Sequence, residues 1–501
     1  MGITSSTSDL LKKEWRELSC SIHVRFKSIV KASAVKQKGF SELEDTMADS
    51  KHELHVGIVG GGLVGSLAAC YFAKRGHSVS VYEYRSDIRK EKLMGQSIDL
   101  ALSTRGREAL RAIGLEDALV KQHGIAMIGR MLHGKNGQLK EMIYDSVKGN
   151  CIYSVNRQYL NEVLLNAAEK YPEVKLYFNS KIVDADIDQG KLTILNMKNH
   201  MTEEVNIDLI IGADGAYSTI RKIFMKRPLF NCSQTYIEHG YIELFIPPGK
   251  NNEFLMSNNH LHIWPRDDFM MIALPNEDHS FTANLFAPFK TLNKLKTSES
   301  LTTFYAEQFP DFLELIGEEK LIKNYFERNP KTLISIKCKP FHMGKTAILV
   351  GDAAHAMVPF YAQGMNAGFE DILLLDNLME KYNSNLDEVL SKFSELRCND
   401  ADAICDLAMY NYIEMRHLVT KKSFAFRRRL DNILHKLIPN TWIPLYSTVH
   451  FTRMSFQECI ANKKWQDKVL QRGLWCIGSL LTAIFAFSLT KINFEHITTM
   501  I

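Results

Sequence analysis

Apolar residues in this chain gather into short continuous runs that end at glycine, a pattern typical of strands buried on both faces. The run at residues 54–59, LHVGIV, is followed by GGGLVGSLAACYFAKRG, in which small and apolar residues continue at helical spacing. Another apolar run, SVSVYE at residues 78–83, follows this helix. A strand, a helix and a second strand within about 30 residues predict a βαβ unit with parallel strands.

Two further apolar runs end at a glycine and an acidic residue. Residues 208–215 read DLIIGADG and lead to Asp214, with a helix expected from about Ser218. Residues 347–352 read AILVGD and lead to Asp352, and another helix pattern starts near Gly364. Because ligands bind at the carboxyl ends of parallel strands, we expect these turns to meet the first βαβ unit around one extended ligand.

The first turn carries the spacing Gly60-x-Gly62-x-x-Gly65, and Glu83 ends the second strand. In such a unit the first glycine allows a tight turn, the second lets the backbone approach a pyrophosphate, and the third lets the helix pack on the strand. The helix N-terminus offers N–H groups to the phosphate, and the acidic residue accepts hydrogen bonds from a ribose. Since Glu83 suits a ribose without a 2′-phosphate, the pattern predicts binding of FAD or NAD.

The more distant turns suit the redox end of FAD. Asp352 is predicted to hydrogen-bond the ribityl chain. The helix that begins at Gly364, Met365 and Asn366 is predicted to point its N-terminus at the flavin, where its N–H groups would stabilise the negative charge of the reduced ring. Taken alone, Asp214 would belong to an ordinary turn before a capped helix.

The two ends of the chain differ from the rest. Residues 473–490 carry no charge, and Trp475 lies at their near edge, which indicates a transmembrane anchor. The basic residues just before this segment are Lys463, Lys464, Lys468 and Arg472. The alternatives are a buried core helix or a helix lying on a membrane or partner. Residues 1–50 are expected to be a poorly ordered extension, with a mitochondrial transit peptide as the alternative.

Composition excludes several classes of function. The 61 basic and 57 acidic residues leave a net charge of only +4, and no basic stripe is interleaved with aromatic residues, so nucleic acid is not an expected partner. None of the nine cysteines forms a C-x-x-C pair. This argues against a structural zinc site or a disulfide framework and favours a reducing compartment. No metal is expected.

The glycine fingerprint, GADGAYSTIR and GDAAHAMVPFYAQGMN together resemble the single-component FAD-dependent aromatic hydroxylases. The resemblance implies bound FAD, with NADPH and molecular oxygen as co-substrates. In that family the element around Asp214 serves both FAD and NADPH, and NADPH has no Rossmann domain of its own, which fits a chain with one fingerprint. The chemistry is carried by the flavin, so no side chain is assigned as catalytic.

Other stretches are similar to the members of this family that act on L-kynurenine: SIDLALSTRGREAL, LHIWPRDDFMMIALPN, DLAMYNYIEMR and IPLYSTVHF. They imply hydroxylation to 3-hydroxykynurenine through a flavin C4a-hydroperoxide, by an enzyme on the mitochondrial outer membrane whose catalytic domain faces the cytosol. The alternatives are a related hydroxylase of another aromatic acid, or a membrane-tethered flavoprotein scaffold without turnover. No oligomeric state is predicted.

The resemblance assigns substrate contacts residue by residue. Arg130 in GIAMIGRMLH matches the arginine that pairs with the substrate carboxylate, a task suited to the guanidinium fork. The residues matched at the amino-acid end are Tyr144, Asn411 and Tyr446, those of the aromatic wall are Phe269 and Phe360, and those expected to shape the pocket are Glu414 and Met415. Taken alone, Tyr446 would be a strand or turn tyrosine.

For FAD, the resemblance adds Arg157 in SVNRQYL and contacts at Val64, Arg85, Ala101 and Ile182. His355 is expected to be a structural histidine. The chain departs from the family pattern at Ala213 in place of cysteine, at Gln96 and Asp99, and at Ala362 in place of a frequent glycine. The methyl group of Ala362 is expected to tighten its loop against the flavin.

The predicted fold class is α/β, with a discontinuous glutathione-reductase-like FAD-binding domain over residues 51–380. A substrate-binding β-sheet is expected to be inserted in it, drawn from about residues 125–148 and 232–290. A helical region over residues 381–470 and the anchor over residues 473–490 complete the expected organisation.

Overall fold

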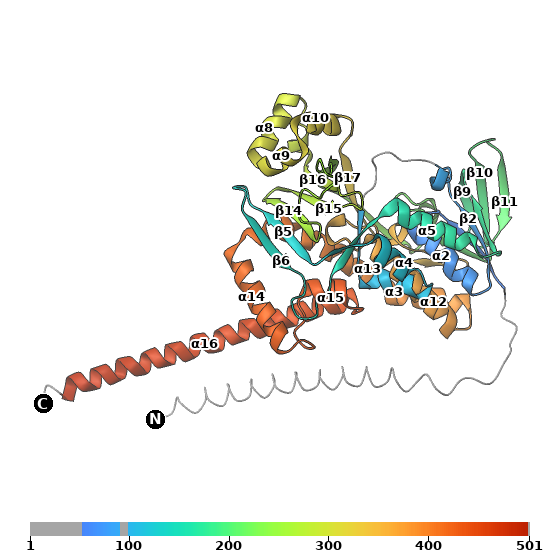
Figure 1. Ribbon diagram of the computed structural model, residues 1–501. Helices are drawn as coiled ribbons and strands as arrows, with labels where there is room; N and C mark the ends of the chain where they lie inside the picture. Colours follow the sequence, from blue (N-terminus) through green and yellow to red (C-terminus); the bar gives the residue numbers. More distant parts are fainter. Residues whose placement is uncertain (1–52, 91–98, 499–501) are drawn as a thin grey trace.

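The computed structural model describes residues 53–90 and 99–498 (Figure 1). The N-terminal extension expected over residues 1–50 and the departure at Gln96 therefore lie outside the described residues. The described chain is of the α/β class, as the sequence predicts.

A six-stranded sheet carries the predicted βαβ unit. Its strand order is β18 (His342–Met343), β19 (Ala347–Leu349), β12 (Leu209–Gly212), β1 (His55–Val59), β2 (Ser78–Tyr82) and β8 (Val174–Tyr177). All neighbours pair in parallel except β18 with β19. In this register Val59 lies opposite both Tyr82 and Gly212, and Gly212 lies opposite Leu349. The prediction that three distant turns meet at one edge of a parallel sheet is thus confirmed.

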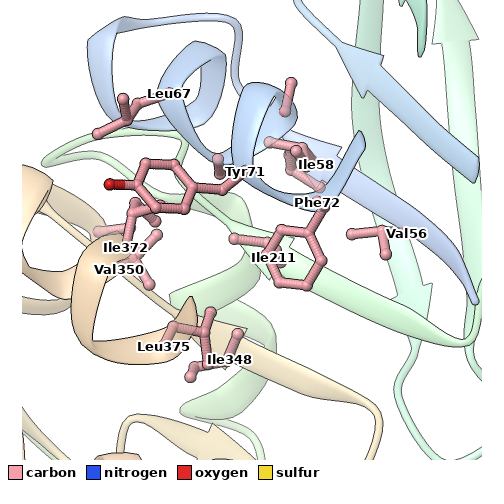
Figure 2. Close-up of a cluster of buried hydrophobic side chains, with 14 of the residues drawn as sticks. Val56, Ile58, Leu67, Tyr71, Phe72, Ile211, Ile348, Val350, Ile372 and Leu375 are labelled. Atoms are coloured by element: carbon pink, nitrogen blue, oxygen red, sulfur yellow. The ribbon is translucent and has the colours of Figure 1, made fainter. Parts of the chain in front are cut away.

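Helices cover this sheet because apolar side chains of the helices pack against apolar side chains of the strands. α2 (Leu63–Lys74) follows β1, and α12 (Gly364–Lys381) returns to the sheet from far along the chain. Figure 2 shows the resulting cluster, in which the labelled side chains are Val56, Ile58, Leu67, Tyr71, Phe72, Ile211, Ile348, Val350, Ile372 and Leu375. The cluster packs the middle of both helices on the sheet and so fixes where their N-termini lie relative to the strand ends.

A seven-stranded sheet forms the second layer. Its order is β17 (Lys331–Lys339), β13 (Asn231–Ile246), β16 (Phe281–Pro288), β15 (Phe269–Pro275), β14 (His260–Arg266), β5 (Gly129–His133) and β6 (Leu139–Ile143). Apart from β17, these strands come from the two stretches expected to form a substrate sheet, and β13 begins one residue before the second of them. Three-stranded sheets also occur, one of β11 (Thr202–Asn206), β10 (Lys191–Asn196) and β9 (Ser180–Asp186), and one of β3 (Asp99–Leu102), β7 (Ile152–Asn156) and β4 (Ile125–Met127).

The remaining helices surround these sheets. Those before residue 360 are α3 (Thr104–Ala112), α4 (Glu116–His123), α5 (Arg157–Glu169), α6 (Thr219–Phe224), α7 (Phe289–Leu292), α8 (Ser298–Gln308), α9 (Pro310–Ile316), α10 (Glu318–Phe326) and α11 (Asp352–His355). The C-terminal part is helical, as predicted: α13 (Leu386–Arg416), α14 (Lys422–Leu437), α15 (Leu445–Phe451) and α16 (Phe456–Thr498).

α16 projects away from the folded part of the chain (Figure 1). Its segment Phe456–Ala486 is long and apolar enough to cross a membrane, and none of its most apolar window is buried against the protein. The expected anchor therefore lies on a helix whose apolar side chains, including Leu474 and Trp475, face outward. This fits membrane association and argues against the alternative of a core helix.

Buried charges tie α12 to α13. Arg397 Nε donates to Asp371 Oδ1 at 2.6 Å, and its Nη1 donates to Glu370 Oε2 at 3.1 Å and to Asp400 Oδ2 at 3.0 Å. Asp371 in turn accepts from Gly351 N at 2.9 Å and contacts His355 Nε2 at 2.6 Å. The network thus holds the turn that carries Asp352, and His355 has the structural place expected for it.

Replacing Arg397 with Met should lower the free energy of unfolding by about 3–5 kcal/mol, because carboxylates that stay buried lose their cation. Thermal or denaturant unfolding of the purified chain in detergent measures the effect. Lys392→Met is the matched control, since Lys392 pairs with Glu395 at the surface of the same helix and its loss should leave the midpoint unchanged. Equal midpoints for Arg397→Met and wild type would contradict the stabilising role of the network.

Candidate functional site

A cavity of about 780 Å³ is lined by both large sheets and by α11, α12, α13 and α15. Most of the site residues predicted from the sequence line this cavity. Those that line it are Gly60, Gly62, Val64, Glu83, Arg85, Ala101, Arg130, Arg157, Ile182, Asp214, Asp352, Phe360, Gly364, Met365, Met415 and Tyr446. Residues as far apart in sequence as Gly60 and Tyr446 therefore border one space.

The three fingerprint glycines meet different surroundings. Gly60 has φ +105°, and a Cβ there would lie 2.6 Å from Ala213 O, so the turn leaves room for glycine alone. A Cβ on Gly65 would lie 1.9 Å from Gly60 O, which explains the close packing of α2 on β1. A Cβ on Gly62 would meet nothing within 4 Å. The space beside Gly62 is therefore free for a ligand.

The N-terminus of α2 opens into this space. Gly62 is the N-cap residue, no side chain caps the helix, and its first turn holds no acidic residue. The unpaired N–H groups and the helix dipole therefore favour an anion such as a pyrophosphate.

Glu83 lies where the sequence places the ribose acceptor. It is buried, its Oε2 accepts from Gly61 N at 2.8 Å, and its Oε1 accepts from Arg85 N at 2.9 Å and Arg85 Nε at 2.8 Å. Arg85 Nη2 also donates to Oε2, at 3.3 Å, so these contacts hold the carboxylate firmly at the cavity wall.

Asp214 has spare accepting capacity. Its Oδ2 accepts from Thr219 N at 2.6 Å, whereas Oδ1 is buried and has no partner among the described residues. Burial raises the pKa of Asp214, although hydrogen bonds from Ser218 and from backbone N–H groups oppose the shift. An unpaired buried acceptor beside a cavity fits a ligand that supplies a hydroxyl or N–H donor.

Asp352 and the start of α12 are neighbours, as predicted. Asp352 follows β19 and is exposed to the cavity, and a Cβ on Gly364 would lie 3.8 Å from Asp352 Oδ1. Gly364 and Met365 line the cavity, whereas the side chain of Asn366 is turned into the wall. There Asn366 accepts from Ser103 N and donates to Ala101 O and Ala362 O, each at 2.8 Å, so it holds two lining residues in place.

Ala362 lines the cavity in the left-handed conformation, with φ +51°. Glycine adopts this conformation without a steric penalty, whereas alanine does so at a cost. A glycine at position 362 would adopt this backbone geometry without that cost.

At the opposite end of the cavity, the predicted polar residues surround the buried guanidinium of Arg130. Arg130 on β5 is 3% exposed, and its Nη1 donates to Glu414 Oε1 at 3.2 Å and its Nη2 to Asn411 Oδ1 at 3.4 Å. Its guanidinium lies over the Tyr446 ring at 4.6 Å. Tyr144 stacks on Tyr446 with a centroid distance of 4.6 Å. Asn411, Glu414 and Tyr144 do not line the cavity themselves but stand behind Arg130 and Tyr446.

The charges at this end favour a bound anion. Burial alone lowers the pKa of Arg130, but the oxygens of Tyr446 and Glu414 more than offset it and raise the pKa overall. Arg130 Nε is buried without a partner among the described residues. Burial and the charge of Arg130 lower the pKa of nearby Arg428 to about 10. Two guanidinium groups thus face one carboxylate, and a second carboxylate would balance them.

The aromatic wall differs from the expectation at one residue. Phe360 lines the cavity and stacks on Tyr412 with a centroid distance of 3.9 Å, and Met415 lines it as well. Phe269 is wrong as a wall residue, because it packs against Phe304 and Phe309 on the other face of the sheet. Side chains alternate along β15, so Ile272 and Leu274 face the cavity and Phe269 faces away from it.

Sequence reasoning missed His450, which lines the cavity one helical turn after Tyr446 on α15. Tyr446 is thus a helical residue and not a strand or turn residue. Gln363 Nε2 lies 3.1 Å from His450 Nδ1, and because an amide N–H can only donate, Nδ1 accepts. Burial, Arg130 and Arg105 hold the pKa of His450 well below its usual value, so the ring is neutral and its hydrogen is on Nε2. That N–H is buried without a described partner. Only the i, i+4 spacing could have indicated it.

Comparisons with known proteins agree with this geometry. Residues 53–408 match the family described as FAD binding domain. The kynurenine 3-monooxygenase of Anopheles gambiae is 52% identical over 465 residues, which cover 90% of this chain and 95% of that protein. The kynurenine 3-monooxygenase of Sus scrofa is 48% identical over 441 residues, which cover 88% of this chain and 93% of that protein.

Solved structures with the same fold include a tetrameric form of 2-methyl-3-hydroxypyridine-5-carboxylic acid oxygenase. Its TM-score is 0.61 at 22% identity, over 81% of this chain and 98% of that one. p-Nitrophenol 4-monooxygenase PnpA from Pseudomonas putida DLL-E4 has a TM-score of 0.59 at 18% identity, over 77% of this chain and 94% of that one. At this identity the likeness concerns the fold.

Replacing Gly62 with Ala should weaken FAD binding by about tenfold or more while leaving the fold intact, a loss of at least about 1.4 kcal/mol. The added methyl group meets no protein atom but enters the space beside the N-terminus of α2. Fluorescence titration of the FAD-free chain measures binding, and its unfolding midpoint is the control for the fold. Wild-type FAD affinity in the Gly62→Ala variant would contradict a close approach of the cofactor at Gly62.

Proposed function

Because this chain belongs to the kynurenine 3-monooxygenase family of flavin monooxygenases, we propose that it hydroxylates L-kynurenine to 3-hydroxykynurenine with FAD, NADPH and molecular oxygen. The observation that carries the proposal is the Arg130–Glu414 pair, buried at one end of a cavity whose other end has a dinucleotide-binding fingerprint. Because both lie on one cavity, an extended cofactor and an amino acid could occupy it together.

The residues present fit FAD. The N-terminus of α2 and the free space at Gly62 suit its pyrophosphate, Glu83 suits its ribose, and Asp352 suits its ribityl chain. The N-terminus of α12, which has no acidic residue in its first turn, suits the flavin end. When bound, FAD supplies the transfer of electrons from NADPH to oxygen and of one oxygen atom to the substrate.

The polar end of the cavity suits the two charges of an α-amino acid. Arg130 would bind the substrate carboxylate through the guanidinium fork, and Glu414, behind Arg130, would balance the substrate ammonium through space without direct contact. Tyr446 and the Nε2–H of His450 add polar atoms at the cavity wall, and Asn411 orients Arg130 while its own amide donates to Phe360 O at 2.7 Å. A substrate held by both charges keeps one orientation along the cavity.

The apolar wall would then position the aromatic ring. Phe360 and Met415 border the space between the polar end and the start of α12, and Ile272 and Leu274 of β15 face the same cavity. These side chains exclude water and hold the ring against the flavin site, with the carbon next to the aromatic amine as the electron-rich target. The protein thus acts by positioning and by excluding solvent.

The parts of the chain divide accordingly. Residues 51–380 form the FAD-binding domain with the inserted substrate sheet, residues 381–470 close the amino-acid end, and residues 473–490 anchor the chain in the mitochondrial outer membrane with the catalytic domain in the cytosol. The outward apolar face of α16 supports the anchor, and the organelle follows from the family alone.

Purified full-length chain in detergent should oxidise NADPH faster when L-kynurenine is present and should release 3-hydroxykynurenine, because the substrate fills the polar end of the cavity. Absorbance at the NADPH band and mass spectrometry of the product measure this. Removal of FAD should abolish turnover, and its return should restore it. NADPH consumption that yields only hydrogen peroxide would contradict L-kynurenine as the substrate, as would selective hydroxylation of another aromatic acid.

Replacing Arg130 with Met should weaken L-kynurenine binding by about 30-fold or more, since truncating one partner of a buried charge pair costs about 2–5 kcal/mol. FAD content should not change, because Arg130 lies at the far end of the cavity from Gly62. Titration of the flavin absorbance with L-kynurenine measures the dissociation constant. The matched control is Arg227→Met, which removes a surface arginine paired with Asp188. If Arg130→Met and Arg227→Met bind L-kynurenine equally well, Arg130 is not the carboxylate site.

A further inference from the structure

α14 exposes an apolar face to solvent. Phe426, Ile433 and Leu437 are 68%, 55% and 71% exposed. Ile433 follows Phe426 by seven residues, and Leu437 follows it by eleven. At 3.6 residues per turn these positions fall on one side of the helix. The opposite side faces the protein, where His435 is buried and Phe424 packs against the core. A helix of a soluble domain would turn these apolar residues inward.

Cations flank the apolar stripe along one edge. Lys422, Arg429 and Lys436 repeat every seven residues, and all three are exposed. Asp431, the single acidic residue of α14, lies on the inner side and pairs with Arg427 and with Trp442 Nε1. An apolar stripe bordered by cations is typical of helices that lie in the interface of a bilayer with anionic lipids.

α14 is placed beside the membrane segment. An ion pair between Arg427 and Asp467 joins α14 to α16 a few residues before the charge-free stretch begins. In Figure 1, α14 lies on the side of the folded part from which α16 projects, and it runs across the direction of α16. If α16 crosses a bilayer, a helix in this position lies along the surface. The apolar stripe on α14 would then continue the apolar surface of α16.

We propose that the outer face of α14 lies on the surface of an anionic lipid bilayer, next to the point where α16 enters it. The premise is that α16 spans the membrane, which belongs to the proposed function. The contact has a consequence for the substrate site, because the inner face of α14 carries Arg428, whose Nη2 donates to Ile143 O at 2.7 Å near Arg130. Lipid would hold a helix that closes the amino-acid end of the cavity.

Lysine acylation of the full-length chain in vesicles tests this contact. Vesicles of phosphatidylcholine with phosphatidylserine carry either wild type or the variant Phe426→Ser/Ile433→Ser/Leu437→Ser, and mass spectrometry follows the rates at Lys422 and Lys436. Both rates should be several-fold slower in wild type than in the variant. Lys198, exposed between β10 and β11 on the far side of the fold, should react equally in both (Figure 1). Equal FAD content would confirm that the variant is folded.

The outcomes separate the possible occupants of the face. Equal rates at Lys422 and Lys436 in wild type and variant, with both chains floating with the vesicles, overturn the α14 contact and leave the anchor in place. If the wild-type chain does not float with the vesicles, both the anchor and the α14 contact are overturned. Turnover with L-kynurenine is measured separately in detergent, so a failure of the proposed activity is distinguished from a failure of membrane binding. Protection that rises with protein density identifies a second copy of the chain as the occupant and overturns the lipid contact. Protection that persists without phosphatidylserine overturns the role of anionic lipid.

Discussion

Close backbone contact at one edge of the parallel sheet is the constraint on which the cavity depends. The turn after β1 passes so near the turn after β12 that a Cβ on Gly60 would lie 2.6 Å from Ala213 O. The turn after β19 and the start of α12 press against Val64 in the same way, since a Cβ on Gly351 or Gly368 would lie 3.0 Å or 2.6 Å from its side chain. Three distant segments can border one ligand because small residues let their backbones meet.

The two ends of the cavity use charge differently. At the dinucleotide end the attraction for phosphate comes from backbone N–H groups, which need no counter-charge in the free protein. At the amino-acid end a full charge is buried, so Arg130 requires Glu414 and Asn411 for as long as no ligand is bound. Arg130 lines the cavity and Glu414 stands behind it, so a ligand carboxylate can reach the guanidinium while Glu414 stays in place. The electrostatics at this end thus favour a ligand that carries an anionic group.

The C-terminal region links the substrate end to the surface from which α16 projects. α13 supplies Asn411 and Glu414, α15 supplies Tyr446 and His450, and α14 covers them with Arg428 on its inner side. Arg105 strengthens this closure, because its guanidinium pairs with Glu370 and its Nε donates to Val449 O on α15 at 3.3 Å. Buried charges on α3 and α12 therefore hold α15, the helix that carries two residues of the substrate end.

The sequence by itself determined the features that depend on local spacing. The βαβ unit, its glycines with Glu83, the turns at Asp214 and Asp352, and the apolar segment of α16 follow from periodicity and from steric rules within a few residues. Tertiary structure decided which face of a strand borders the cavity, and so it separated Phe269 from Ile272 on β15. It also brought Arg130 to Glu414, 284 residues later, and turned the face of α15 that carries Tyr446 and His450 toward the cavity. Alternation along a strand defines two faces but does not say which one a distant helix will cover, because that choice depends on packing between elements that no local pattern records.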